Sequence, residues 1–193
     1  MTILLAVITT LAGALAGGMV SLFTLRQKVR EEARLLHKRR QIEEFYGPLF
    51  GLIQYGAAIN EIEDARLPAS ARDEKGRPRD EEGGKVIRFF REHYYLPLNM
   101  QITELIRTKI YLLDTDALPD SFTEFIKHAA QLDAFHRLWK EAEISTHGIK
   151  PIEYPAAFKT DVEITLNRLR REYNEYTSGS GIVSILARRR TLN

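Results

Sequence analysis

The sequence predicts an all-α protein with one N-terminal transmembrane helix followed by a cytoplasmic bundle of four to five helices. Three observations lead to this prediction. Residues 2–25 carry no charge, apolar side chains later in the chain recur at spacings of three and four, and the alternating pattern typical of β-strands is not found. Of 193 residues, 44% are hydrophobic and 28% charged, which is typical of a folded domain and not of a disordered one.

Residues 1–25 form the predicted transmembrane helix. A helix over residues 2–25 would be about 36 Å long, and the hydrocarbon slab of a bilayer is about 30 Å thick. A soluble core helix is rarely so evenly apolar. A cleaved signal peptide is the main competing interpretation, because Ala14-Leu15-Ala16 has the small residues of a cleavage site. No basic residue precedes that site and the apolar run continues to Leu25, so we expect the helix to stay as an anchor.

Within this helix, Gly13, Gly17 and Ser21 lie on one face at a spacing of four. Small residues at this spacing let two membrane helices approach closely, although glycine is also common in membrane helices that pair with nothing. The spacing predicts helix–helix packing and a homo-oligomer.

Charge sets the predicted orientation. Residues 26–40 hold seven basic residues against two acidic ones, and a basic flank stays on the cytoplasmic side. We therefore expect the N-terminus outside and the bulk of the chain in the cytoplasm. Residues 26–41 form a predicted juxtamembrane helix in which Arg26, Lys28 and Arg30 contact anionic headgroups of the lipid bilayer.

Residues 42–178 form the predicted cytoplasmic helical domain. Pro48 lacks the N–H that a helix interior needs, so it suits the first turn of a new helix, and Pro97 is expected to kink or restart a helix. Residues 67–85 form a predicted flexible loop, because their charges, glycines and prolines cannot bury a face. We expect no internal repeat.

Two more helices complete the predicted domain. Ser121 and Glu124 have capping-box spacing, which predicts that Ser121 closes the amino end of a helix. Pro155 is expected to start the last helix and Ser178-Gly179 to end it. The predicted core positions, all at helical spacing, are Leu98, Ile102, Leu105, Ile106 and Leu113, then Phe125, Ala129, Leu132, His136 and Trp139, and finally Phe158, Val162, Leu166, Leu169, Tyr173 and Tyr176.

Residues 179–193 form a basic tail. Apolar residues there precede Arg188, Arg189 and Arg190, a combination typical of an interfacial segment. We expect these arginines to contact the membrane surface; a frayed tail, or a strand packed on the bundle, is the alternative.

The side chains that carry chemistry are sparse. The chain has no Cys, which excludes disulfides and thiolate chemistry. Between the two basic ends the chain is net acidic, which disfavours nucleic-acid binding. His128, Asp133 and His136 are candidate metal ligands, but His128 and Asp133 point about 140° apart on a helix. We therefore expect neither a metal nor a cofactor.

Arg88 and His93 are candidate catalytic residues. Their spacing in "RFFREH" resembles that of HEPN-type helical ribonucleases. The resemblance implies that His93 would act as acid or base and that Arg88 would hold the phosphate. Phe89 departs from that family, which usually has a polar residue after the arginine.

The segments "EFYGPLFGLI", "EHYYLPLN", "LIRTKIYLLD" and "FHRLWKE" resemble a loose group of uncharacterised single-span bacterial membrane proteins with a helical cytosolic region. The resemblance implies a bacterial inner-membrane location and no particular activity. We therefore expect a single-pass inner-membrane protein that presents a helical interaction or sensing domain to a protein partner of unknown identity. The alternative is a membrane-tethered enzyme or toxin-like effector that uses Arg88 and His93.

Overall fold

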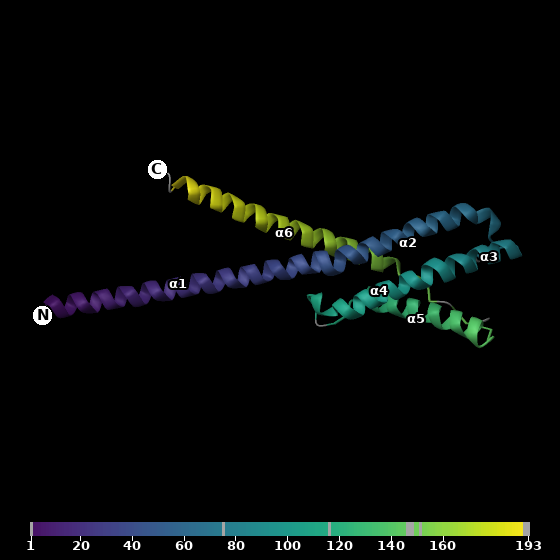
Figure 1. Cartoon of the computed structure of the whole chain (residues 1–193), viewed down its shortest axis with the longest axis horizontal. Coiled ribbons are helices and arrows are strands. Elements are labelled where there is room, and N and C mark those ends of the chain that lie inside the picture. Colours follow the sequence, from purple (N-terminus) through teal and green to yellow (C-terminus); the bar gives the residue numbers. More distant parts are fainter. Residues whose placement is uncertain (1, 75, 116, 146–148, 151, 191–193) are drawn as a thin grey trace. The chain divides into compact units, whose positions relative to one another are not determined.

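The computed structural model describes the backbone of residues 2–190 except 75, 116, 146–148 and 151, and the side chains of residues 21–178 with the same gaps. The chain divides into two compact units, residues 1–39 and 40–193. All elements of the described residues are helices (Figure 1), and the only β pairing among them is one isolated bridge between Arg72 and Pro78. The predicted all-α class is therefore confirmed.

The first unit is formed by helix α1, Thr2–Arg40, whose last residue already belongs to the second unit. Most of the predicted transmembrane segment, including Gly13 and Gly17, lies outside the residues whose side chains the structure describes. Within the described part of the chain, no helix combines the length and the apolar character needed to cross a bilayer. Among the large apolar side chains of α1 that are described, Leu35 is half-buried and the others are exposed, namely Leu22, Phe23, Leu25, Val29 and Leu36.

The described residues of the second unit form five α-helices joined by loops and shorter helical turns. The α-helices are α2 (Gly47–Arg66), α3 (Glu81–Phe90), α4 (Leu96–Lys109), α5 (Asp120–Glu141) and α6 (Ala156–Arg190). Two π-helical turns, η1 (Gln41–Tyr46) and η3 (Arg91–Tyr95), precede α2 and α4, and two 3₁₀ turns are η2 (Ala69–Ala71) and η4 (Ile110–Leu112).

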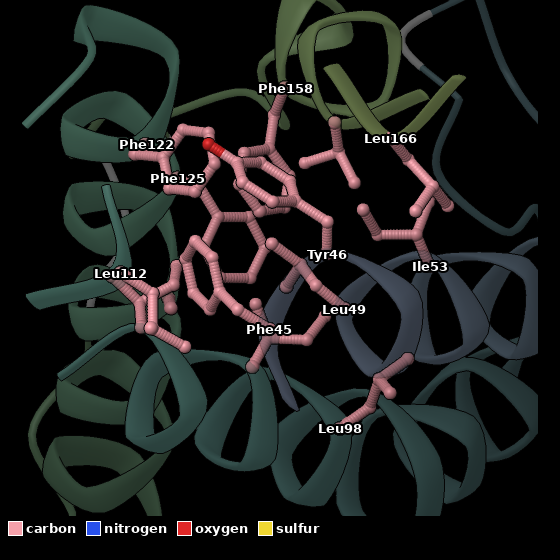
Figure 2. Close-up of a cluster of buried hydrophobic side chains, with 14 of the residues drawn as sticks. Phe45, Tyr46, Leu49, Ile53, Leu98, Leu112, Phe122, Phe125, Phe158 and Leu166 are labelled. Carbon is pink, nitrogen blue, oxygen red and sulfur yellow. The ribbon is translucent and has the colours of Figure 1, made fainter. Parts of the chain in front are cut away.

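The core of this unit is built around aromatic rings. Phe45 and Tyr46 of η1 meet Phe122 and Phe125 of α5 and Phe158 of α6 (Figure 2). The rings of Phe125 and Phe158 stack with centroids 4.4 Å apart, and Phe122 meets Phe158 edge to face at 5.0 Å. Each such pair contributes about 0.5–1.5 kcal/mol beyond its burial. The aromatic cluster therefore joins η1, α5 and α6 into one unit.

Most predicted core positions are buried. The buried ones are Leu98, Ile102, Ile106, Phe125, Ala129, Phe158, Val162, Leu166 and Leu169, whereas Leu105, Leu113, Leu132, His136 and Tyr173 are half-buried. Trp139 and Tyr176 are exposed. The predicted apolar stripes of α5 and α6 are therefore buried in the first half of each helix. Their side chains become more exposed toward the carboxyl end.

The prolines at 48 and 97 do not interrupt the chain's helical path. A proline ring collides with the carbonyl four residues earlier and offers no N–H to it. Here each proline follows a wider π-helical turn, in which the N–H of Gly47, or of Leu96, bonds to the carbonyl five residues earlier. Helices α2 and α4 begin one residue before Pro48 and Pro97. The chain is already helical before each proline, so the predicted break in the helix is not found there.

The two π-helical turns share a sequence. Residues 43–49 read EEFYGPL and residues 92–98 read EHYYLPL, so Glu, Tyr, Pro and Leu recur at the same offsets. Lys109 at the end of α4 pairs with Glu44 of η1, while the end of α2 contacts η3. Helices α2 and α4 therefore run antiparallel. The π-helical turn η1 lies at one end of this pair and η3 lies at the other. This likeness covers seven residues, so the expected absence of an internal repeat stays a prediction.

Arg72 organises much of the charged segment 67–85. Its guanidinium donates to the carbonyls of Leu67 and Gly76, at 3.2 and 3.4 Å, and to the carboxylates of Glu63 and Asp64. The structure differs from the predicted loop at its end, because α3 begins inside this segment at Glu81. The side chain of Asp80 caps α3 by accepting the N–H of Gly83 at 2.7 Å.

Two predicted helix ends are wrong. Pro119, and not Ser121, is the N-cap of α5. The Pro119 carbonyl already accepts the N–H groups of the first turn, so Ser121 lies inside the helix and its hydroxyl has no partner among the described residues. Helix α6 continues past Ser178-Gly179 to Arg190 and includes both Gly179 and Gly181, each of which costs a helix only about 1 kcal/mol.

Candidate functional site

A cavity of about 650 Å³ lies inside the second unit, between α2, α3, η3, α4, α5 and the start of α6. A volume of this size is typical of sites for small organic molecules. Its lining combines apolar and polar groups: Ile53, Gly56, Ala57, Asn60, Glu63, Arg72, Ile87, Arg91, Tyr95, Leu98, Asn99, Ile102, His128, Leu132, Tyr154 and Lys159. It is the candidate functional site.

The apolar part of the lining comes mainly from α2 and α4. Ile53, Leu98 and Ile102 are buried and belong to the main core. Gly56 lets the two helices approach, because a Cβ atom at this position would lie 2.8 Å from the Cδ2 atom of Leu98. The apolar wall of the cavity is therefore formed by residues of the domain's core.

One carboxylate and three cations line the cavity. The carboxylate, Glu63, is 7% exposed as a residue and is held by Arg72, with Nη2 3.0 Å from Oε1. A buried carboxylate needs such a partner, because removing it from water without one is costly. The charge of Glu63 is thus already matched by Arg72.

The other two cations, Arg91 of η3 and Lys159 of α6, are half-buried at the cavity wall. Neither forms an ion pair with any carboxylate among the residues that the structure describes. The cavity therefore holds two unmatched positive charges, which would favour an anion inside it.

Tyr95 and Asn99 add two polar groups beside Arg91. The hydroxyl of Tyr95 is buried and meets no acceptor at full hydrogen-bond geometry within the described part of the chain, although the Glu63 carboxylate interacts with it. Burial, together with the neighbouring Glu63 carboxylate, raises the pKa of Tyr95 above its usual range, so the hydroxyl keeps its proton. Asn99 is 8% exposed. Arg91, Tyr95 and Asn99 follow one another at a spacing of four, which places them on one helical face.

His128 and Tyr154 form the wall contributed by α5 and the segment before α6. The Nδ1 atom of His128 lies 2.7 Å from the carbonyl oxygen of Ile152. A carbonyl only accepts, so Nδ1 carries the proton and Nε2 is the acceptor of the neutral ring. The Tyr154 ring packs edge-on against the His128 ring at 5.7 Å, and the Ile152 N–H donates to the side chain of Gln131. These contacts hold the segment against α5.

The structure places the predicted catalytic residues outside this cavity. Arg88 of α3 and His93 of η3 are exposed, and neither is part of the lining. The His93 ring packs on Phe89, with centroids 4.7 Å apart. Each residue thus lies on an exposed helical surface.

The candidate metal ligands are also separated. His128 lines the cavity, Asp133 pairs with Arg137 at 2.9 Å, and His136 lies 6.2 Å from the Trp139 ring. Among the described residues, no three His, Cys, Asp or Glu side chains come together as a metal site.

The predicted membrane and packing residues are only partly described. Ser21, Arg26, Lys28 and Arg30 are exposed on α1. Gly13, Gly17, Arg188, Arg189 and Arg190 lie outside the residues whose burial and side-chain contacts the structure describes.

Sequence reasoning missed the residues that define the cavity. The spacing of Arg91, Tyr95 and Asn99 would have pointed to a polar helical face within an otherwise apolar segment. Glu63, Arg72 and Lys159 offered no comparable signal, because they come from separate parts of the chain and meet only in the folded domain.

Comparison of the chain with protein-family models, with curated proteins and with solved structures finds no match.

Proposed function

We propose that the chain is a single-pass membrane protein whose helical domain senses a small molecule by binding it in the cavity. One observation carries this proposal: six elements bring two unmatched cations, a buried tyrosine hydroxyl and an apolar wall to one partly open pocket. Pockets with mostly apolar lining and a few convergent polar groups are typical binding sites for small molecules.

The membrane anchor in this proposal is supported by the sequence of residues 2–25, which are uncharged and followed by a basic cluster. The N-terminus would lie outside the bacterial inner membrane and the helical domain in the cytoplasm. Arg26, Lys28 and Arg30, together with Arg188, Arg189 and Arg190, would contact anionic headgroups on the inner leaflet.

Signalling from such a domain requires a second component. We include two in the proposal: a further copy of the chain, paired through the face of Gly13, Gly17 and Ser21, and a protein partner of the helical domain. The enzymatic alternative, with Arg88 and His93 as its site, gains no support from the geometry, since both side chains are exposed and lie outside the cavity.

Two adjacent alanines of α2 allow a matched test. Ala57 lines the cavity, whereas Ala58 is exposed and does not. The full chain would be expressed in bacteria, recovered from carbonate-washed membranes and reconstituted in lipid nanodiscs. Its thermal unfolding would then be followed with and without the small-molecule fraction of a bacterial extract. We expect the extract to raise the unfolding temperature of the wild type and of Ala58→Phe, but not of Ala57→Phe.

Two results would contradict this proposal. Loss of the chain from the membranes during the carbonate wash would contradict the anchor. An equal thermal shift in the two phenylalanine variants, or no shift in the wild type, would contradict binding in the cavity. Circular dichroism would check that Ala57→Phe is folded, and Ala57→Leu replaces it otherwise.

A further inference from the structure

We propose that the ligand of this cavity is an organic anion with an apolar body, a carboxylate or a phosphate monoester, whose charged group lies between Arg91 and Lys159. This inference rests on the proposed function and names its ligand class. It is carried by the charges, the hydrogen-bond donors and the apolar surface of the cavity.

The charges favour an anion. Of the three cations in the lining, only Arg72 is matched, by Glu63 at 3.0 Å and by Asp64 at 3.2 Å. Arg91 and Lys159 remain, each half-buried and each without a carboxylate partner in the described part of the chain. Partial burial removes some of the water that would hydrate these two charged groups. An anion that contacts them would compensate for this loss.

The hydrogen-bonding groups favour an acceptor-rich ligand. Arg91 and Lys159 are donors only, the Tyr95 hydroxyl keeps its proton, and Asn99 offers an amide N–H₂. The carboxylate of Glu63 already accepts from Arg72 and also interacts with the Tyr95 hydroxyl. A ligand with several acceptor oxygens would satisfy these donors, as carboxylates and phosphates do.

The apolar residues of the lining favour a ligand that is more than a small inorganic ion. Ile53, Leu98 and Ile102 are buried core residues, and Ile87 and Leu132 add further apolar surface. A cavity of about 650 Å³ is far larger than one phosphate ion needs. A hydrocarbon or aromatic portion of the ligand would cover the apolar wall and gain free energy by leaving water.

The test uses four probes with the same eight-carbon tail: octanoate, octyl phosphate, octanol and octylammonium. The full chain in nanodiscs of zwitterionic phosphatidylcholine would be titrated with each probe by isothermal titration calorimetry. Nanodiscs carrying Ala57→Phe would be the reference for partition into lipid. We expect saturable binding of the two anions that is at least tenfold tighter than binding of octanol, and no saturable binding of octylammonium.

Substitution of Arg91 and Lys159 tests whether these two cations bind the anion. Arg91→Met and Lys159→Met keep apolar side-chain length but remove the charge, and each should weaken octanoate binding by about tenfold, the effect of losing one charge-assisted contact. Arg88→Met is the matched control, because Arg88 is exposed and outside the cavity. Its affinity should equal that of the wild type.

The outcomes separate this inference from the proposed function. If octanol binds as tightly as octanoate, or if Arg91→Met and Lys159→Met bind octanoate like the wild type, the anion assignment is overturned while a ligand cavity remains. If no probe and no extract fraction distinguishes the wild type from Ala57→Phe, the proposed function itself fails.

A final comparison identifies the source of the anion. Nanodiscs that contain anionic phosphatidylglycerol should leave octanoate affinity unchanged if the natural ligand is a soluble metabolite, after correction for surface potential by comparison with uncharged octanol. A lipid-derived ligand would instead compete, and octanoate affinity would fall in the wild type in proportion to the anionic lipid. Either result supports an anion in the cavity, whereas anionic lipid that tightens octanoate binding contradicts it.

Discussion

Arg72 is the residue on which the charged segment between α2 and α3 depends most directly. It contacts Glu63, whose side chain is 9% exposed, and the carbonyl of Leu67. Arg72→Leu would leave the buried carboxylate without a partner. Breaking a buried pair costs about 3–5 kcal/mol, and because Arg72 is 20% exposed we expect a loss of about 2–3 kcal/mol in the unfolding free energy of the full chain, measured by urea denaturation.

The control for this variant is Arg77→Leu. Arg77 pairs with Asp73 at an exposed position in the same segment, so its loss should change the unfolding free energy by less than about 0.5 kcal/mol. Equal losses in the two variants would show that Arg72 does not anchor Glu63. In the Arg72→Leu background, Glu63→Leu should recover part of the lost stability, because it removes the unpaired charge.

Glu44 gives the molecule a defined response to acid. It lies between Arg40, with Nε 2.9 Å from Oε1, and Lys109, with Nζ 2.8 Å from Oε2. The hydrogen bond from Arg40, and next the one from Lys109, lower the pKa of Glu44 from 4.5 to about 2. A carboxyl whose pKa is lower in the folded state stabilises the fold above its unfolded pKa, and this contribution is lost as the pH falls from 4.5 toward 2.

We therefore expect the stability difference between wild type and Glu44→Gln to shrink as the pH falls from about 5 to about 2. Urea denaturation of the full chain at a series of pH values would measure it. Glu141→Gln is the control, because Glu141 is exposed and forms no ion pair within the described residues. A Glu44→Gln difference that stays constant over this range would rule out the paired state of the carboxylate.

At the scale of elements, the two π-helical turns explain how α2 and α4 present their side chains. Each turn holds one more residue than an α-helical turn of the same rise, so side chains before it are rotated relative to those after it. In η3, Arg91 and Tyr95 line the cavity while His93, between them, is exposed, as their spacing of four already gives. The extra residue of the turn instead rotates the residues before it relative to those after it. A helical wheel drawn through this segment at a constant 100° per residue would therefore assign the wrong face to some residues.

Helix α1 carries the prediction for self-association. Gly13 and Gly17 lie one turn apart, and replacing both with Ile would prevent the close backbone approach that small residues allow. We expect Gly13→Ile with Gly17→Ile to reduce the signal of a bacterial membrane two-hybrid assay to background. The control pair, Leu11→Ile with Leu15→Ile, has the same spacing on the other side of the helix and keeps its apolar character, so it should retain the signal. An unchanged signal in the glycine variant would contradict self-association through the face of Gly13 and Gly17.

At the scale of the whole molecule, apolar spacing predicted the helical class and much of the core. Phe158, Val162, Leu166 and Leu169 are all buried, because a stripe of large apolar side chains on a helix has to be covered by another element. The same reasoning found where α2 and α4 begin, since proline restricts the local backbone whatever lies around it. Such features depend on neighbours in the sequence and so can be read from it.

The cavity depends on contacts between distant parts of the chain and was not predicted. Arg91 and Lys159 belong to different helices, and no local pattern marks them as neighbours. The capping box shows a related difficulty: Ser121 has the expected spacing to Glu124, yet Pro119 begins the helix earlier and places Ser121 inside it. Pro119 and Ser121 are both local signals for a helix start, and the structure is needed to show that Pro119 is the N-cap of the helix.

The exposed end of α5 gives the molecule its own optical probe. Trp139 is the one tryptophan of the chain, its ring lies 6.2 Å from His136, and the next residue, Lys140, pairs with Glu92 of η3 at 3.4 Å. Indole emission shifts in wavelength with access to water and is quenched by a protonated imidazole nearby. The fluorescence of the unlabelled protein should therefore follow movement of η3 against α5 in real time.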